Sequence, residues 1–330
     1  MAYSPRVPFL VYILFISFSV GMGTFCAAGP RQTVVIHKPG KTLSGHRILV
    51  PQRDLLPHRG PLLYSNAALI LDQTTGTVLY EKNARVIMPI ASITKLMTAM
   101  VVLDARQDLS DHLSISSRDI DRLRGSSSRL PVGFMLTRKH MLQLALMSSE
   151  NRAASALARY YRGGTAAFVR AMNRKAKMLG LMNTYFADPT GLSRANASTA
   201  RDLVRLVTMA YRYPLIRLFT TAPQQRLFVN GRLLIYNNTN SLVESPQWRI
   251  NLSKTGFIRE AGRCLVMHTW LNNNPTVIVL LNSQGVLMRA TDANRIRQWV
   301  EDIQQTRLSR QECSKPRPGR FLAGGRYAAC

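Results

Sequence analysis

The sequence is poor in acidic residues and in cysteine, and it lacks several patterns that would assign a function directly. It has no Cys-x-x-Cys pair, and none of its six histidines stands in a His-Glu-x-x-His motif, so neither a dithiol redox site nor a familiar zinc site is indicated. No period of about 20 to 50 residues is visible, which argues against a solenoid. The apolar residues are too dispersed for a polytopic membrane protein. A chain of 330 residues, 46% of them hydrophobic, can nevertheless bury a substantial core.

The scarcity of acid leaves a large positive charge on the chain. There are 44 Lys and Arg against 17 Asp and Glu, which gives a formal net charge of +27. The segments 29–60 and 307–330 are unusually basic for their length, and the region between them holds most of the remaining charge. Such a protein attracts any polyanion, whether nucleic acid, anionic lipid or a carboxylate-bearing cell wall.

The first 28 residues resemble a cleavable signal peptide. Arg6 precedes an apolar run over 9–20, and small residues follow as far as Ala28. The run is short for a bilayer core of about 30 Å, although an uncleaved anchor is the alternative, and Phe25 before Cys26 does not suit a lipoprotein. We therefore expect export, which removes most nucleic acid from reach.

Export also bears on the cysteines. Cleavage after Ala28 would leave Cys264, Cys313 and Cys330, and three cysteines cannot all pair within one chain. An oxidising compartment would allow a disulfide, for example between Cys313 and Cys330, but the sequence does not establish one.

An ordered domain is expected over 61–306, after a basic leader at 29–60 that has at most one short strand, at 47–50. A turn rich in Asp, Thr and Gly between two apolar segments predicts a hairpin of strands at 67–71 and 77–81. Helices are expected at 92–105, 137–147, 151–161, 166–179, 199–211 and 293–304, and further strands at 226–229, 232–236, 249–255, 264–271 and 276–281. This order predicts an α+β domain in which helices cover an antiparallel sheet, followed by a basic, disordered tail at 307–330.

Ser92 and Lys95 begin the most apolar of the expected helices. Because they are three residues apart, their side chains share one helix face. A serine hydroxyl becomes a nucleophile only when a neighbour accepts its proton, and a lysine can do this only when burial or a nearby cation lowers its pKa. The apolar helix would supply that burial. Taken alone, however, the pattern is more simply explained by Ser92 as a helix cap and Lys95 as a side chain that reaches the surface.

Two further short motifs have the same ambiguity. Ser149 and Asn151 lie between two expected helices, where they could face a cleft or only cap a helix. Lys254, Thr255 and Gly256 lie in an expected strand and offer a cation, a hydroxyl and a position without a side chain. Together, however, Ser-x-x-Lys, Ser-x-Asn and Lys-Thr-Gly, in this order and in these contexts, are the motif set of penicillin-binding proteins and serine β-lactamases.

From about residue 66 to residue 304 the sequence resembles the low-molecular-mass penicillin-binding proteins of the D-alanyl-D-alanine carboxypeptidase family. The resemblance extends beyond the three motifs to the segment at 71–83, to Asp-Pro-Thr-Gly-Leu at 188–192 and to Ser-Thr-Ala-Arg-Asp-Leu at 198–203. It implies the fold of serine β-lactamases and DD-peptidases, in which helices cover an antiparallel sheet and a helical subdomain is present. It implies neither a metal nor an organic cofactor.

Three features resemble the endopeptidase branch of the family, the branch of penicillin-binding protein 7. One is Ser-Ser-Glu-Asn-Arg-Ala-Ala at 148–154, where carboxypeptidases more often have Ser-Gly-Asn, and another is the segment 260–267. The third is the short stretch after Gly256, which leaves no room for the extra β domain and membrane tail of typical carboxypeptidases. The resemblance thus implies cleavage of D-alanyl-diaminopimelyl cross-links in the periplasm, with a DD-carboxypeptidase as the alternative. It does not explain the basic leader and tail.

Carried over by position, the resemblance assigns a role to each motif residue. Ser92 would attack the D-alanyl carbonyl, Lys95 would take its proton, and Ser149 would pass a proton to the leaving amine. The substrate-binding residues would be Asn151, Lys254, Thr255, Gly256 and Phe257. The backbone N–H groups of Ser92 and Phe257 would form the oxyanion hole. The expected partners are peptidoglycan peptide stems, β-lactam antibiotics and other wall hydrolases, without nucleic acid, and the protein could be loosely associated with the wall or the membrane.

Two other functions remain open from the sequence. A β-lactamase is disfavoured because no Glu-x-x-x-Asn segment resembling the deacylating loop of class A enzymes is obvious. A non-catalytic basic protein that binds the cell wall is the alternative from a different class. The arginine-rich stretch at 118–129 is expected to be a solvated face or a cleft rim, where it could help to hold acidic peptide stems. His268, on an apolar strand, is expected to be a satisfied core residue.

Overall fold

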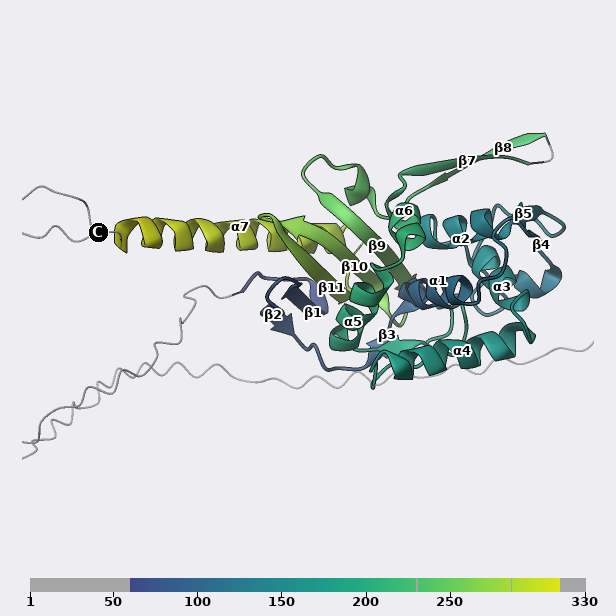
Figure 1. Cartoon of the computed structure of the whole chain (residues 1–330), viewed down its shortest axis with the longest axis horizontal. Coiled ribbons are helices and arrows are strands. Elements are labelled where there is room, and N and C mark those ends of the chain that lie inside the picture. The colour runs from purple at the N-terminus through teal and green to yellow at the C-terminus, as the bar shows by residue number, and fades with distance from the viewer. Residues whose placement is uncertain (1–59, 230, 286, 315–330) are drawn as a thin grey trace, which may run out of the picture. The chain divides into compact units, whose positions relative to one another are not determined.

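The computed structural model describes residues 60–229, 231–285 and 287–314 of the chain (Figure 1). The expected signal peptide, the leader up to residue 59 with its strand at 47–50, and the tail from 315 onward lie outside the described residues. Within the described ranges, no helix is both long enough and apolar enough to span a bilayer.

An antiparallel sheet of five strands lies at the centre of the fold, in the order β2, β1, β11, β10, β9. Its strands are β1 (Ser65–Asp72), β2 (Val78–Lys82), β9 (Arg249–Ile258), β10 (Gly262–Leu271) and β11 (Asn274–Ser283). The first turn has the expected chemistry, because the carboxylate of Asp72 accepts hydrogen bonds from the backbone N–H groups of Thr74 and Thr75 at 2.8 and 3.1 Å. Strand β9 is at one edge of the sheet, where helical elements contact it.

The two faces of the sheet pack against different helices. Successive side chains of a strand point to opposite faces, so neighbouring residues enter different layers. On β11, Val279 belongs to the larger core cluster, on the side of α5 (Ala200–Ala210), whereas Ile278 packs in the cluster that includes Ile296 of α7 (Met288–Ser314). The sheet is therefore covered on both faces, as Figure 1 shows.

Helix α1 (Thr94–Asp104) runs through the middle of the helical part. Every residue from Thr94 to Val102 is buried, as expected for a helix that is apolar nearly all round. Around it lie α2 (Arg138–Met147), α3 (Asn151–Arg159), α4 (Gly164–Met178), α5 and α6 (Pro214–Thr221). Such a central helix is a rigid base for the residues at its N-terminus.

The remaining elements are short. Strand β3 (Met88–Pro89) pairs with β6 (Ala197–Ser198), β4 (His112–Ser114) with β5 (Met135–Thr137), and β7 (Gln224–Val229) with β8 (Arg232–Asn237). Single 3-10 turns are η1 (Ala91–Ile93), η2 (Ser117–Asp119) and η3 (Ser241–Glu244). The β7–β8 pair is the hairpin predicted from its Asn-Gly turn.

The α+β class and most of the expected elements are confirmed. The short strands β3, β4, β5 and β6 are not expected from the sequence, and the helices differ at three places. The helix expected from Ser92 begins at Thr94, because η1 precedes it. Helix α6 is not expected from the sequence, although Pro214 at its first position is a recognisable start signal. Helix α7 begins at 288 rather than 293 and continues to 314, so it covers the first part of the segment assigned to a disordered tail.

Candidate active site

The expected nucleophile, Ser92, lies on a tight turn just before α1. It is the central residue of η1, and Ala91 before it has a φ of +47°, which is uncommon for a residue with a side chain. Two glycines make room for the turn. A Cβ on Gly191 would lie 2.0 Å from the carbonyl oxygen of Ala91, and one on Gly256 would lie 3.1 Å from the backbone nitrogen of Ser92. The turn is thus held between the 188–192 segment and β9.

Lys95 is completely buried, one helical turn after Ser92. Its Nζ lies 2.8 Å from Oγ of Ser92, 2.7 Å from Oδ1 of Asn151 and 2.7 Å from the carbonyl oxygen of Thr190. The amine therefore has three oxygen neighbours, which come from three separate segments of the chain.

Burial lowers the pKa of Lys95 to about 7, because the charged ammonium loses its hydration. The carboxylates of Asp188 and Glu150 act in the opposite direction and limit the shift. A substantial fraction of the molecules consequently holds a neutral amine at neutral pH.

The three neighbours of the amine determine where its lone pair can point. A neutral amine has two N–H groups and one lone pair. The oxygens of Asn151 and Thr190 can only accept hydrogen bonds, so they can take both N–H groups. The lone pair of Lys95 is then left for the hydroxyl of Ser92, which can donate. This geometry suits proton transfer from Ser92 to Lys95.

The carbonyl of Thr190 is fixed by a folded loop. The carboxylate of Asp188 accepts hydrogen bonds from the backbone N–H groups of Thr190, Gly191 and Ser193, at 2.6, 2.8 and 2.9 Å. Nδ2 of Asn196, which is fully buried, donates to the carbonyl oxygen of Asp188 at 3.1 Å. The segment 188–192, which resembles the family, therefore has a physical role: it holds the carbonyl oxygen of Thr190 beside Nζ of Lys95. The residue types of the segment alone do not reveal this role.

The second motif lies at the junction of α2 and α3. Ser149 has a φ of +61°, and its Oγ accepts a hydrogen bond from Nζ of Lys254 at 3.0 Å. The side chain of Glu150 caps α3 by accepting the backbone N–H of Arg152 at 3.2 Å, and Asn151 is the first residue of that helix. The capping role therefore belongs to Glu150, while the two motif side chains each contact a buried lysine.

The third motif lies within β9. Lys254 is 1% exposed, and its pKa is lowered well below the usual value, first by burial and then by the positive charges of Lys95 and Arg289. Arg289 donates to the carbonyl oxygen of Thr239 at 3.2 Å, and the hydroxyl of Thr255 donates to that of Thr239 at 2.6 Å. Hydrogen-bond donors and cationic groups are thus concentrated here. Arg289 cannot be recognised from the sequence, because no motif marks it.

The structure places the residues of all three motifs in one connected site. Ser92 and Asn151 meet at Lys95, and Ser149 meets Lys254. Gly256 follows on the same strand and packs against the turn that carries Ser92. Phe257, the last predicted site residue, has a 57% exposed side chain, with the guanidinium of Arg263 4.9 Å from its ring centroid.

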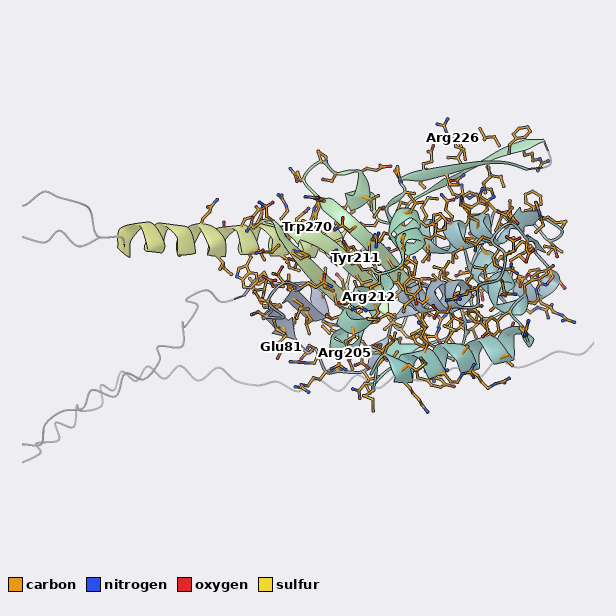
Figure 2. The ribbon with its side chains drawn as sticks, in the orientation of Figure 1. Glu81, Arg205, Tyr211, Arg212, Arg226 and Trp270 are labelled. Carbon is orange, nitrogen blue, oxygen red and sulfur yellow. The ribbon has the colours of Figure 1, made fainter. Side chains whose placement is uncertain are left out.

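His268 lies in the core and has partners on both ring nitrogens. It is fully buried, and Nε2 lies 2.6 Å from Oε1 of Gln73 while Nδ1 lies 3.3 Å from Nδ2 of Asn251. Its ring stacks on Tyr211, at the end of α5 (Figure 2), with 3.8 Å between the centroids. Burial lowers the pKa of His268 to about 4. The expectation of a satisfied core histidine is confirmed.

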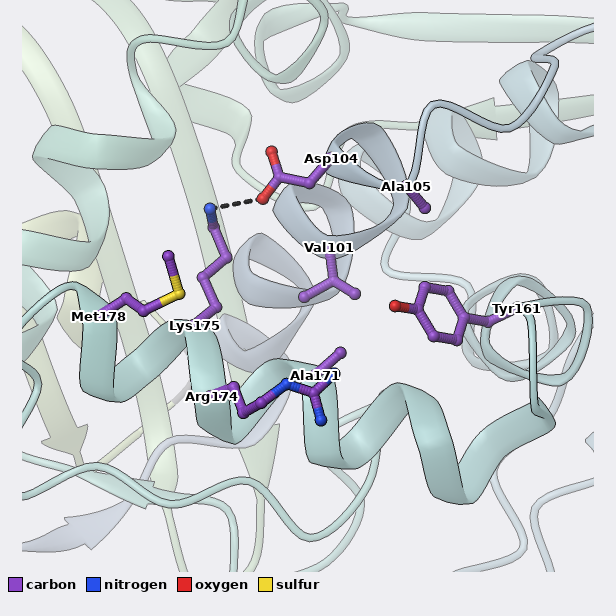
Figure 3. Close-up of a pocket in the computed structure, with 8 residues that line it drawn as sticks. All are labelled: Val101, Asp104, Ala105, Tyr161, Ala171, Arg174, Lys175 and Met178. Carbon is purple, nitrogen blue, oxygen red and sulfur yellow. Dashed lines mark hydrogen bonds and ion pairs between the residues drawn. The ribbon is translucent and has the colours of Figure 1, made fainter.

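A separate hollow lies between α1 and α4, and none of the predicted site residues borders it. Figure 3 shows the residues that line it: Val101, Asp104, Ala105, Tyr161, Ala171, Arg174, Lys175 and Met178. Its central charges are paired, because Nζ of Lys175 lies 2.6 Å from Oδ2 of Asp104. Over the described part of the chain, no group of three or more His, Cys, Asp or Glu is arranged to hold a metal ion.

Comparisons with known proteins place the chain among enzymes. A family model described as D-alanyl-D-alanine carboxypeptidase matches residues 58–285. The D-alanyl-D-alanine endopeptidases of Pseudomonas aeruginosa and Escherichia coli are 48% and 47% identical to the chain, over 74% and 73% of its length and 80% and 78% of theirs.

Solved structures agree with this assignment. A Streptomyces DD-transpeptidase, 28% identical, superposes with a TM-score of 0.68 over 74% of this chain and 100% of its own. A penicillin-binding protein of Listeria monocytogenes in a cefotaxime-bound form, also 28% identical, gives 0.66 over 74% and 100%. With a family match over most of its length and the motifs gathered in one site, the chain belongs to the D-alanyl-D-alanine carboxypeptidase family, a family of serine hydrolases with the DD-peptidase fold.

Proposed function

We propose that this protein hydrolyses the D-alanyl-diaminopimelyl cross-links of peptidoglycan through an acyl-enzyme on Ser92. The observation that carries the proposal is the surroundings of Lys95, whose Nζ lies within 2.8 Å of a hydroxyl and of two oxygens that only accept. Endopeptidase activity is favoured over carboxypeptidase activity because two relatives that are 48% and 47% identical are endopeptidases.

Acylation begins when Lys95 takes the hydroxyl proton of Ser92. The oxygen then attacks the D-alanyl carbonyl carbon, the bond to the leaving amine breaks, and water later hydrolyses the ester. The backbone N–H groups of Ser92 and Phe257 are the proposed oxyanion donors, since β9 is an edge strand with one side free of strand partners. Each such donor contributes about 3 to 4 kcal/mol to the transition state.

Ser149 is the proposed donor of the proton to the leaving amine. Its Oγ already accepts a hydrogen bond from Nζ of Lys254, so its own hydrogen is free to point into the site. When Ser149 gives that hydrogen away, Lys254 stands ready to replace it. A lysine with a lowered pKa gives up its proton more easily, which suits this role of Lys254.

The other end of the site suits a carboxylate on the leaving side of the substrate. Arg289 supplies positive charge, and Lys254 and Thr255 supply hydrogen-bond donors, within one small region. A bound carboxylate would raise the pKa of Lys254 again and form charge-assisted hydrogen bonds. Asn151, which touches both Lys95 and Ser126, is proposed to orient the lysine and the acyl donor.

The proposed location and partners follow from this substrate. Peptidoglycan cross-links lie in the periplasm, and the N-terminal segment 1–28 has the composition of an export signal. The positive charge of the protein would favour loose association with the anionic wall or membrane. β-Lactams would acylate Ser92, other wall hydrolases are candidate partners, and nucleic acid is not one.

Cross-linked muropeptide dimers test the proposal. Incubation with the purified protein should convert dimers to monomers, and Ser92→Ala should abolish the conversion while the exposed Ser110→Ala leaves it unchanged. Dimers that persist while a pentapeptide loses its terminal D-alanine would instead assign the protein as a carboxypeptidase.

A further inference from the structure

The segment 118–123 forms one wall of a hollow that also borders two neighbours of Lys95. The hollow has a volume of about 360 Å³, and the segment 188–193 supplies the opposite wall. Asn151 and Thr190, which both contact Nζ of Lys95, also line it. The steps proposed above do not use the outer part of this hollow, so it extends the site beyond the reacting bond.

The acidic residues of the two walls are already engaged within the protein. Asp119 is 3% exposed, and its carboxylate pairs with the guanidinium of Arg159 at 2.8 Å. The carboxylate of Asp121 accepts the backbone N–H groups of Leu123 and Ser126, both at 2.9 Å. The carboxylate of Asp188 likewise accepts backbone N–H groups of its own loop. The three carboxylates therefore stabilise the walls of the hollow.

The arginines on this wall and next to it differ in their partners. Arg124 is fixed, because its Nε donates to the carbonyl oxygen of Leu192 at 2.5 Å and its Nη1 lies 2.9 Å from Oε2 of Glu260. Arg118 and Arg122 border the hollow itself and are exposed, and no ion pair of the described ranges includes either of them. Asp121 and Asp188 line the same hollow and keep their negative charges, but their oxygens already accept backbone N–H groups. The two exposed guanidinium groups, which have no ion-pair partner, are therefore the groups of this wall that can bind an anionic ligand.

We propose that this hollow binds the acyl-donor peptide stem of the substrate through the free carboxylates of the stem. Arg118 and Arg122 bind the carboxylates of the stem. The exposed side chains of Ile120 and Leu123 contact the aliphatic parts of the stem. The inference rests on the proposed function, because the occupant must be continuous with the acyl group on Ser92. It develops the expectation that the stretch 118–129 is a cleft rim that helps to hold acidic peptide stems.

Two synthetic acyl donors of equal length test the inference. Both contain the same scissile D-alanyl bond, but the upstream carboxylates are free in one donor and amidated in the other. The wild-type protein should cleave the carboxylated donor with a kcat/KM about fivefold higher, as expected for two partly exposed ion pairs. The preference should fall as salt is added, because salt screens exposed charges.

The double variant Arg118→Gln/Arg122→Gln should lose this preference and keep the wild-type rates on the amidated donor and with benzylpenicillin. Arg212→Gln, an exposed arginine after α5 that Figure 2 labels, is the matched control and should keep the preference. A preference that survives in the double variant, or that Arg212→Gln also removes, overturns the subsite. A wild-type protein that neither reacts with benzylpenicillin nor cleaves either donor overturns the proposed function itself, so the two failures are distinguishable.

Discussion

Gly256 lies so close to Ser92 that a Cβ at position 256 would be 3.1 Å from the backbone nitrogen of the serine and 2.9 Å from the carbonyl oxygen of Ile90. Gly191 approaches the same turn from the other side, and its Cβ would lie 2.0 Å from the carbonyl oxygen of Ala91. At Gly256 and Gly191, strand β9 and the 188–192 segment therefore leave no room for a side chain beside the turn that carries Ser92. The position of Ser92 depends on both glycines.

Gly191→Ala should abolish acylation by a fluorescent penicillin, because the new methyl group must displace the turn that carries Ser92. Position 191 also has a φ of +85°, which by itself is unfavourable for alanine. Gly76→Ala separates the two effects, since Gly76 has a φ of +70° but nothing within 4 Å of an added Cβ. That control should lose about 1 kcal/mol of stability and keep its acylation rate. Equal acylation rates in the two variants would refute the close-packing explanation.

The rate of acylation should depend on pH through Lys95. Because the pKa of Lys95 is lowered to about 7 and only its neutral form can accept a proton, the second-order rate constant with benzylpenicillin should fall about tenfold per pH unit below that value. Above a pH of about 7 the rate constant should reach a plateau. A stopped-flow or gel-based profile that stays flat across neutral pH would contradict the assignment of Lys95 as the base.

Asp188→Asn should move this pH profile toward lower pH. The charge of Asp188 favours the protonated form of Lys95, so its removal lowers the pKa of the lysine further. Asparagine keeps one oxygen that can accept the backbone N–H groups of Thr190 and Gly191, so the loop should persist. Asp121→Asn is the control, because Asp121 also binds backbone N–H groups but does not act on Lys95. A uniform loss of rate without a shift would show that Asp188 acts only through the loop.

The stability of the fold should depend on pH through His268. Its pKa is about 4 in the folded protein against 6.5 ordinarily, so between these values the unfolded chain binds a proton that the folded chain does not. Unfolding is consequently favoured as the pH falls from 6.5 toward 4, and this contribution levels off below. His268→Gln should be less stable overall but show a weaker dependence of Tm on pH in this window. If the Tm of His268→Gln depended on pH as strongly as that of the wild type, a group other than His268 would be responsible.

Much of the fold could be predicted because local patterns and tertiary packing agree. The turn after Asp72 and the apolar run of α1 each have one plausible structure, and both are found as expected. The limits of α7 could not be predicted in the same way, because its second half is polar and lacks an apolar stripe that would mark its end.

The candidate site could be predicted only where a motif marks it. Ser92, Lys95 and Asn151 are recognised by spacing, and the structure brings them together. Thr190 contributes its backbone carbonyl oxygen, which any residue type would provide, so its identity gives no signal. Arg289 is in no motif, so nothing in the sequence distinguishes it from the other arginines. Long-range contacts of this kind leave no local signal in a single sequence.

The location of a penicillin adduct tests the central claim most directly. Wild-type protein, Ser92→Ala and Lys95→Met would each be incubated with benzylpenicillin at pH 7, digested and analysed by peptide mass spectrometry. We predict one penicilloyl group on the wild-type peptide that contains Ser92, none in Ser92→Ala, and little or none in Lys95→Met. An adduct on another peptide, or full acylation of Lys95→Met, would contradict a serine nucleophile activated by this buried lysine.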